Sequence, residues 1–321
     1  MNPIVIKRTS ELSREEIEQI CTLFNKIFPN HSISPQSYVN HYSSTPLGYS
    51  IHALLKNEAG DIVGNHNLLP NFYLFDGKRV LFAYGAGTMI LKEYRNFLTY
   101  RRLIADSQKY AVEKENCSFL MGFPNENAYP VQKKGLKRQD IGNLPIFMLP
   151  IHIGCIKKSL FLFNGISSCL SKLFLLLSKI CLGSKKEHIA LVHKDHSSFE
   201  RCRYVDAKYH FIRMQGYYGV YCVSDYNQVR TAFILDVNPL SQRNFDSIVR
   251  TVYKECKADK IDAIMFVGYL PFKSKTLFRV PEKLSPKKFY FVGTIFDNTV
   301  IDKRIFELRN WEVSLADYDL I

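Results

Sequence analysis

The sequence lacks the motifs of several common classes of enzyme and metal protein. Its eight cysteines are scattered, with no Cys-x-x-Cys pair and no Cys/His spacing of the zinc type. They indicate thiols in a reducing compartment, and no metal site is predicted. There is no glycine-rich nucleotide loop of the P-loop type and no serine-hydrolase elbow. The amino terminus has no apolar secretory core, which predicts a cytoplasmic protein.

Low-complexity and disordered segments are also missing. The 321 residues are 46% hydrophobic and 23% charged, so the chain can bury a sizeable core, and its length favours two domains over one. The formal net charge of +13 indicates an anionic partner, such as nucleic acid, a phosphorylated cofactor or a membrane surface. General solubility explains the charge equally well, because Lys and Arg are dispersed along the chain.

The first half has an ordered series of predicted elements. Hydrophobic periodicity and turn residues predict strand, two helices, a three-stranded meander, helix, strand, helix and strand. The expected ranges are 3–8, 13–28, a short helix after Pro35, 49–57, 61–77, 78–91, 97–114, 117–123, a helix ending at Gly135, and 144–150. Ser13 and Glu16 form a predicted capping box at the first helix.

Residues 83–136 then contain the stretch GFPNENAYPVQKKGL, at positions 122–136. Together with the element order, this stretch resembles the GNAT acyltransferase superfamily, above all bacterial members with FPN-x-x-AYP followed by GL or GF. The resemblance implies that Phe123-Pro124-Asn125 ends a strand that splays from its neighbour to admit pantetheine. Physically, a thioester donor needs a strand edge for its amides and a helix amino terminus for its pyrophosphate.

The resemblance also implies roles for single residues. Tyr129 is the candidate acid for the departing thiolate, and Glu93 and His66 are weak candidates for the base that deprotonates the amine. Each of the three has a structural alternative, and Asn125 reads better as a helix cap than as a ligand. The expected acyl-CoA-binding residues are Met89, Ile90, Leu91, Arg95, Asn96, Phe97, Leu98, Thr99, Tyr100, Arg101, Phe123 and Asn125.

The chain departs from the family pattern in the loop that meets pyrophosphate. Leu98 and Tyr100 stand where the family has glycine or alanine, so side chains there can obstruct the close approach of backbone N–H groups. Arg95, Arg101 and Arg102 can compensate by direct contact with phosphate, or they can form a solvated helix face.

The second half, 187–321, has a similar but less clear order of predicted helices and strands, which predicts a degenerate GNAT-like domain. A helix and two strands, an amphipathic helix at 241–258 and further strands are expected, with the closing residues 310–321 as the last strand. This ending looks like that of polysaccharide-cluster acyltransferases, which implies that Trp311, Asp317 and Asp319 hold the hydroxyls of an amino sugar. A strand end in solvent is the alternative.

Residues 151–186 form a predicted helical insertion between the domain at 1–150 and the second domain. Within 159–182, Asn164, Ser168, Ser171, Lys172, Ser178 and Lys179 make a narrow polar stripe on an otherwise apolar helix. Flanking Lys157, Lys158, Lys185 and Lys186 favour contact with an anionic membrane surface, and packing across the domains is the alternative.

The sequence therefore predicts an α/β (α+β) fold, with a mixed, mostly antiparallel sheet in each of two tandem GNAT-like domains. The expected activity is N-acyl transfer from acetyl-CoA or another acyl-CoA to a primary amine, plausibly of an amino sugar for surface polysaccharide. One alternative is a Fem-type aminoacyl transferase, for which the positive charge would serve a tRNA donor. The other is a GNAT-derived binding module without catalysis.

Overall fold

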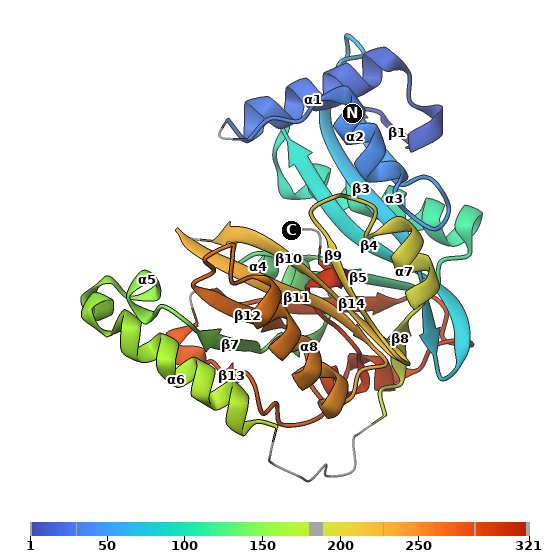
Figure 1. Ribbon diagram of the computed structural model, residues 1–321. Coiled ribbons are helices and arrows are strands. Elements are labelled where there is room, and N and C mark those ends of the chain that lie inside the picture. Colours follow the sequence, from blue (N-terminus) through green and yellow to red (C-terminus); the bar gives the residue numbers. More distant parts are fainter. Residues whose placement is uncertain (1, 30, 180–188, 227, 286, 319–321) are drawn as a thin grey trace. The chain divides into compact units, whose positions relative to one another are not determined.

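The computed structural model describes residues 2–29, 31–179, 189–226, 228–285 and 287–318 (Figure 1). Lys185, Lys186 and Asp319, singled out above, lie outside these ranges, and so does Cys181. The chain forms two compact units, each assembled from separate segments. The first unit comprises Met1–Gly142, Lys194–Arg203 and Tyr290–Phe306, and the second comprises Asn143–His193, Tyr204–Phe289 and Glu307–Ile321. These units differ from the contiguous ranges 1–150, 151–186 and 187–321 expected from sequence.

A mixed sheet organises the first unit. Its strand order is β1-β2-β3-β4-β5-β14-β6, antiparallel at the pairs for which the register is known except between β4 and β5, which run parallel. The strands are β1 (Ile4–Arg8), β2 (Ile51–Lys56), β3 (Ile62–Phe75), β4 (Lys78–Ile90), β5 (Phe119–Gly122), β14 (Tyr290–Ile295) and β6 (Gln139–Asn143). The predicted meander is thus β2-β3-β4.

Helices connect and flank these strands. They are α1 (Arg14–Ile27), α2 (Pro35–Ser43), α3 (Phe97–Glu115), α4 (Ala128–Pro130) with the π-turn η3 (Val131–Gly135), and α7 (His196–Cys202). Short 3-10 turns are η1 (Thr9–Glu11), η2 (Lys92–Tyr94) and η6 (Lys303–Phe306). The capping box predicted for α1 is confirmed, because Ser13 Oγ accepts from Glu16 N and the Glu16 carboxylate accepts from Ser13 N.

The second unit is built on its own mixed sheet, of order β13-β7-β12-β11-β10-β9. The strands are β7 (Ile146–Pro150), β9 (His210–Met214), β10 (Tyr217–Tyr226), β11 (Val229–Asn238), β12 (Ala263–Val267) and β13 (Phe278–Arg279). The helical elements are α5 (Ile153–Ile156), η4 (Lys158–Phe163), α6 (Asn164–Leu177), α8 (Gln242–Glu255), η5 (Glu282–Leu284), η7 (Leu308–Asn310) and η8 (Leu315–Asp317). Buried Phe245, Ile248 and Val249 of α8 pack against Ile234 and Ile264 of the sheet.

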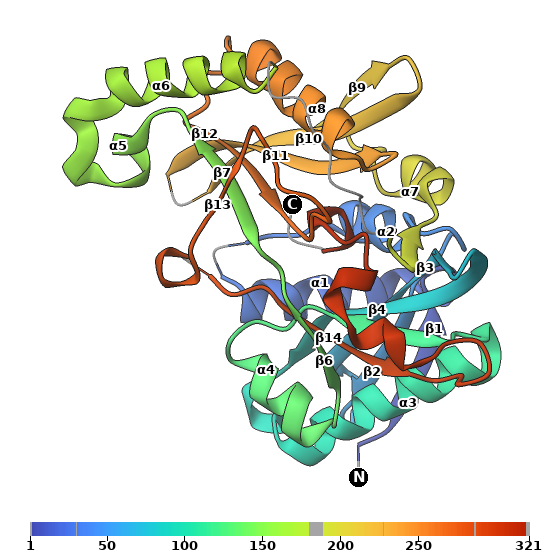
Figure 2. The same ribbon diagram turned by 90° about the horizontal axis from the view of Figure 1, so that it is seen from below.

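The two units repeat one topology. In each, an antiparallel meander is followed by a helix and by a strand that returns parallel to the last strand of the meander, β5 beside β4 and β12 beside β11. The other edge of β5 and of β12 pairs with an antiparallel strand from a distant part of the chain. This strand is β14 in the first unit and β7 in the second. In Figure 1 red β14 lies near green β5, and in Figures 1 and 2 green β7 lies near orange β12.

Two sequence-based assignments need correction. The strand at 144–150, expected to complete the first domain, is β7 of the second unit. Residues 310–318, expected as a closing strand, contain the 3-10 turn η8 and take part in two isolated bridges, Val192 with Trp311 and Gly268 with Ser314. β8 (Val192–Lys194) lies where the chain passes from the second unit to the first.

Candidate active site

The parallel strands β4 and β5 part within the first unit. Their pairing runs from Phe82–Phe119 to Tyr84–Met121 and ends there, whereas β4 continues to Ile90 along β3. From Gly85 onward, the β5 side of β4 has no strand partner among the described residues. An open strand edge beside a parting neighbour can pair with the amides of an extended ligand. We call this opening the β4/β5 notch.

A β-bulge shapes the open part of β4. Asn65 faces Met89 but Asn67 faces Ala86, so Gly87 and Thr88 together lie opposite His66. Gly87 has φ +59°, and a methyl group added there would lie 2.6 Å from the Tyr42 hydroxyl and 2.7 Å from Nδ2 of Asn67. The bulge therefore needs glycine for both its conformation and its close approach to polar side chains.

Arg138 lies in the notch between the two strands. A methyl group added at Gly122 of β5 would lie 2.7 Å from its Nη1, and one added at Gly85 of β4 would lie 3.8 Å from its Nη2. Arg138 is 4% exposed; Nη1 donates to Oε1 of Gln132 at 2.8 Å, and Nε has no hydrogen-bond partner in the described part of the chain. Burial lowers the pKa of this guanidinium to about 10, so it stays charged at neutral pH. A buried cation that forms no ion pair with any described residue is costly unless a ligand supplies electron-rich atoms.

His66 is buried beside this guanidinium. Its Nδ1 lies 2.7 Å from Oγ1 of Thr88, and Nε2 has no partner among the residues described. Burial, and then the charge of Arg138, lower the pKa of His66 to about 3. A group with so low a pKa is a poor proton acceptor, so the structure argues against His66 as the base for the amine.

Tyr129 lies in the helical turn that follows β5. Its hydroxyl donates to Oδ1 of Asp140 at 2.8 Å, Lys133 also contacts Asp140, and its ring stacks on Tyr290 of β14 at 3.9 Å between centroids. Burial and the hydrogen bond to Asp140 raise the pKa of Tyr129 above that of a free phenol. The hydroxyl therefore carries its proton at neutral pH, as an acid must.

The start of α3 has a polar cap and exposed apolar side chains. Asn96 Oδ1 accepts from Thr99 N at 2.9 Å, and the Arg95 guanidinium donates to the Ile90 carbonyl at 3.2 and 2.8 Å. Phe97 and Leu98 are exposed at 49% and 57%. Tyr100 is half-buried, and burial raises the pKa of its hydroxyl. The charge of Arg138 and a hydrogen bond with Gln132 partly offset this rise, so the hydroxyl lies near these two residues of the notch.

The remaining predicted residues take different places. Met89 and Ile90 are buried, Leu91 donates its N–H to Val63 O, and Glu93 and Arg101 are exposed on the surface. Arg102 contacts the Asn2 carbonyl at 3.5 Å. Phe123 is buried against Phe291. Asn125 Oδ1 accepts from Ala128 N at 2.9 Å, so the cap interpretation of Asn125 holds.

Trp311 and Asp317 belong to the second unit and are buried. Trp311 is 1% exposed, and Asp317 Oδ2 accepts from Ser314 N at 2.9 Å as part of a capping box. Neither side chain is open to an amino sugar in this structure, so their predicted role in holding the acceptor needs correction. Asp319, the third member of that set, lies outside the described residues.

The second unit closes the equivalent opening with its own chain. The pairing of β11 with β12 ends at Ile234–Phe266, and a bulge follows at Leu235. Ser314 Oγ donates to the Leu235 carbonyl at 2.5 Å, and Ser314 bridges to Gly268 directly after β12. A methyl group at Gly268 would lie 2.3 Å from the Val313 carbonyl. Of these two openings, only the one in the first unit is left unfilled by main chain among the described residues.

Sequence reasoning missed Arg138, Asn67, Tyr42 and Gly87. Gly85 and Gly87 gave a usable signal, because glycines inside a predicted strand indicate a bulge or a close approach. Arg138 gave none, since it follows a run of surface lysines and only the fold turns it inward.

Comparisons with known proteins support the fold. No protein-family model and no curated protein matches the chain. Among solved structures, the chain is similar to a GCN5-related N-acetyltransferase from Anabaena variabilis, at TM-score 0.56 and 15% identity, covering 91% of this chain and 73% of that one. A probable N-acyltransferase from Enterococcus faecalis gives TM-score 0.53 at 12% identity, covering 91% and 72%. Saccharomyces cerevisiae N-myristoyltransferase with bound myristoyl-CoA gives 0.50 at 8%, covering 91% and 79%.

These likenesses define the fold class. The chain has the α+β GNAT-like fold, with two mixed sheets flanked by helices, and the predicted fold class is confirmed. At such low identity the comparisons show the fold alone, so the activity has to be argued from the site.

Proposed function

We propose that the first unit is an N-acyltransferase that moves an acyl group from an acyl-CoA thioester to a primary amine. The β4/β5 notch, with the charged and incompletely bonded Arg138 held inside it, is the observation that carries this proposal. Acyl transfer passes through a tetrahedral oxyanion, and fixed donors in a water-poor site stabilise such a charge strongly. The donor is a substrate, and acetyl-CoA and longer acyl-CoAs are all candidates.

In this mechanism, the open edge of β4 from Gly85 to Ile90 pairs with the amides of the donor's pantetheine arm. Arg138 donates to the oxyanion as the amine attacks, because its Nε has no other partner among the described residues. Tyr129 turns its single hydroxyl proton from Asp140 to the departing thiolate, and Lys133, which donates to the Tyr129 oxygen, stabilises the phenolate that is left. The N–H groups at the start of α3 face the pyrophosphate, with Arg101 free on the surface to assist.

Neither base candidate from the sequence is suited to the amine. His66 is too weak a base, and Glu93 lies exposed on η2, where it can act only if the acceptor reaches it. We therefore propose that the amine enters in its neutral form and loses its proton to water after attack. This predicts a rate that rises with pH as the acceptor's ammonium group deprotonates.

Calorimetry with a series of acyl-CoAs tests the donor. Binding that is lost in Gly85→Ala, which narrows the notch, and kept in Ser314→Ala of the second unit would support the proposal. Failure with every acyl-CoA, together with binding of charged tRNA, would favour the aminoacyl-transfer alternative. Failure with both would favour a binding module.

The acceptor is proposed separately, as an amino sugar that becomes part of a surface polysaccharide. It rests on the sequence resemblance alone, since Trp311 and Asp317 are buried. A panel of free amino sugars, nucleotide-linked amino sugars, polyamines and peptides with one active acyl-CoA would test it. Transfer to peptides and not to sugars would end the amino-sugar proposal and leave the N-acyltransferase proposal intact.

A further inference from the structure

Helix α6 of the second unit is oriented with its polar side toward the protein. Ser171 Oγ donates to the Pro150 carbonyl at 2.6 Å, Ser167 Oγ donates to the Ile151 carbonyl at 2.8 Å, and Asn164 Oδ1 accepts from Gly154 N at 2.6 Å. Near the carboxyl end, Arg250 of α8 donates to Ser178 Oγ at 3.1 Å. Asn164, Ser171 and Ser178 of the predicted polar stripe therefore attach the helix to its unit.

The opposite side of the same segment is apolar and faces outward. The exposed large side chains of η4 and α6 are Phe161, Leu162, Phe163, Ile166, Leu170, Leu173, Leu176 and Leu177, and each is at least 50% exposed. Lys158–Leu177 is long and apolar enough to cross a membrane by length and composition, and 11% of its apolar 18-residue window is buried. We call these eight side chains the α6 face. Its polar side is already bonded to the second unit, so the helix is placed to lie along a surface, not to span a bilayer.

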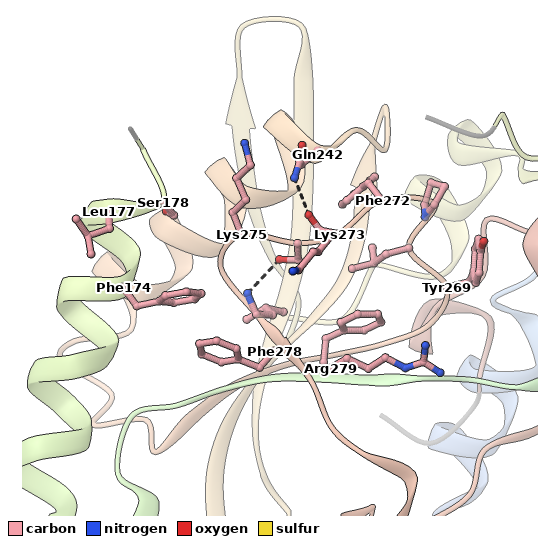
Figure 3. A pocket seen from close by; sticks show the side chains of 15 residues that line it. Phe174, Leu177, Ser178, Gln242, Tyr269, Phe272, Lys273, Lys275, Phe278 and Arg279 are labelled. Carbon is pink, nitrogen blue, oxygen red and sulfur yellow. Dashed lines mark hydrogen bonds between the residues drawn. The ribbon is translucent and has the colours of Figure 1, made fainter. Parts of the chain in front are cut away.

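A pocket of about 1230 Å³ adjoins the α6 face within the second unit (Figure 3). Phe174 of α6 and Phe278 of β13 stack at 4.4 Å between ring centroids and form a shared wall. Phe147, Leu270, Phe272 and Leu277 make the lining apolar. An apolar pocket next to an exposed apolar helix suits a ligand with a long hydrocarbon chain.

Cations surround both features. Lys273 and Arg279 line the pocket and are exposed, and neither forms an ion pair with a described residue. Lys157, Lys158, Lys172 and Lys179 border the α6 face and are likewise exposed. The sequence from Ile141 to Lys186 contains no acidic residue at all. The α6 face therefore presents positive charge with no acid from this segment to offset it. Beside the pocket, the buried Asp246 carboxylate accepts from Ser274, Lys275 N and Thr276, and the exposed charges of the lining are those of Lys273 and Arg279.

This charge distribution selects between possible partners. A second copy of the chain, docked symmetrically through the same face, would bring the same lysines against these lysines. An anionic bilayer instead offers hydrocarbon for the leucines and phosphate for the lysines. We propose that the second unit docks on an anionic phospholipid membrane through the α6 face. The pocket takes an acyl chain of one lipid, and Lys273 and Arg279 contact its phosphate.

Flotation of the full-length protein with vesicles tests the docking. The vesicles are phosphatidylcholine alone and phosphatidylcholine mixed with phosphatidylglycerol. The protein should float with the mixed vesicles, and binding should weaken without vanishing as salt screens the lysines. The double variant Leu170→Glu, Leu173→Glu should bind at least roughly tenfold more weakly, because charge is placed in the apolar contact. Val205→Glu, at an equally exposed apolar residue of the second unit, is the matched control and should float normally.

Native mass spectrometry tests the pocket. Protein recovered from mixed vesicles should retain one phosphatidylglycerol, and Lys273→Ala, Arg279→Ala should lose it about tenfold more readily. Protein that stays soluble with both vesicles and remains monomeric overturns the proposal. Self-association abolished by the leucine variant, without flotation, overturns it in favour of a second copy. Acyl-CoA binding is measured independently, so neither result bears on the proposed transfer reaction.

Discussion

The two units have the same strand order but treat the opening between their parallel strands differently. In the first unit the notch holds the side chain of Arg138, attached to Gln132 by one hydrogen bond. In the second unit the opening is filled by main chain, where Ser314 bonds Leu235 and bridges Gly268. A side chain can change partners when a ligand arrives, whereas a bridged main-chain segment can leave only if local structure opens. Under the proposed function, the first unit is the one that binds substrate, and the second unit supports it.

The largest expected effect comes from Arg138→Met, which removes the charge and nearly keeps the volume. Turnover should fall about 10²–10³-fold because a donor to the oxyanion is lost. The free energy of unfolding should stay level or rise, since an unpaired buried charge is replaced by an apolar chain. Steady-state kinetics and urea unfolding measure the two quantities.

Arg250→Met is the matched control in the second unit, because the guanidinium that it removes donates to Ser178 and to no other side chain in the described part of the protein. It should leave turnover unchanged. Full activity in Arg138→Met would show that Arg138 is structural. The difference between the β4/β5 notch and the opening of the second unit would then have no consequence for catalysis.

The next effect compares two glycines. Gly268→Ala places a methyl group 2.3 Å from the Val313 carbonyl, and we expect it to cost about 1–3 kcal/mol of stability. Gly85→Ala meets its neighbours at 3.6 Å or more, so its stability should hardly change. Hydrogen exchange should rise at 311–318 in Gly268→Ala only, and acyl-CoA affinity should fall in Gly85→Ala only. The opposite pattern would assign the working site to the second unit.

Acid should lower the stability of the first unit more than that of the second. Burial raises the pKa of Glu16, but hydrogen bonds from Lys7, Ser13 and Lys56 outweigh it and lower the pKa to about 2, below the ordinary 4.5. The pKa of Asp195 is lowered to about 2 as well, and both groups lie in the first unit. A depressed carboxyl pKa stabilises the fold above the unfolded pKa, and this stability is lost as pH falls toward the folded pKa.

The first unit should therefore lose roughly 2–3 kcal/mol between about pH 5 and pH 2 from Glu16 alone. Hydrogen exchange resolved by unit, at a series of pH values, measures this, and Glu16→Gln should flatten the dependence. Acid unfolding of the second unit first would contradict the expectation.

The smallest effect is predicted for Tyr129→Phe. Turnover should fall only about tenfold, because a thiolate with a pKa near 8.5 leaves without much assistance. Donor affinity should not change, since the ring keeps its stacking on Tyr290. Tyr290→Phe is the control and should behave as the unaltered protein. Equal turnover in both variants, under conditions where chemistry limits the rate, would remove Tyr129 from the mechanism.

Local features of the sequence were sufficient for most elements of both units. The capping box of Ser13 and Glu16, the meander with its turns, and the amphipathic α8 all follow from spacing over a few residues. The resemblance around Phe123–Tyr129 also led to the correct strand pair. These predictions succeeded because each depends on contacts within one element or one turn.

Tertiary structure decided what depends on distant partners. Strand periodicity states which residues are buried but not which strand lies alongside, so the sequence could not place β7 in the second sheet or β14 in the first. The same reason explains α6, whose stripe of serines was visible but whose orientation was set by carbonyls of the preceding residues. The burial of Arg138 has the same cause. This arginine follows surface lysines in the sequence, and it is enclosed only because β4, β5 and the turn after β5 come together in the fold. The sequence by itself determined the elements and the family of folds. The tertiary structure decided which of two similar openings stays unfilled by main chain in the described residues, because that depends on segments distant in the sequence.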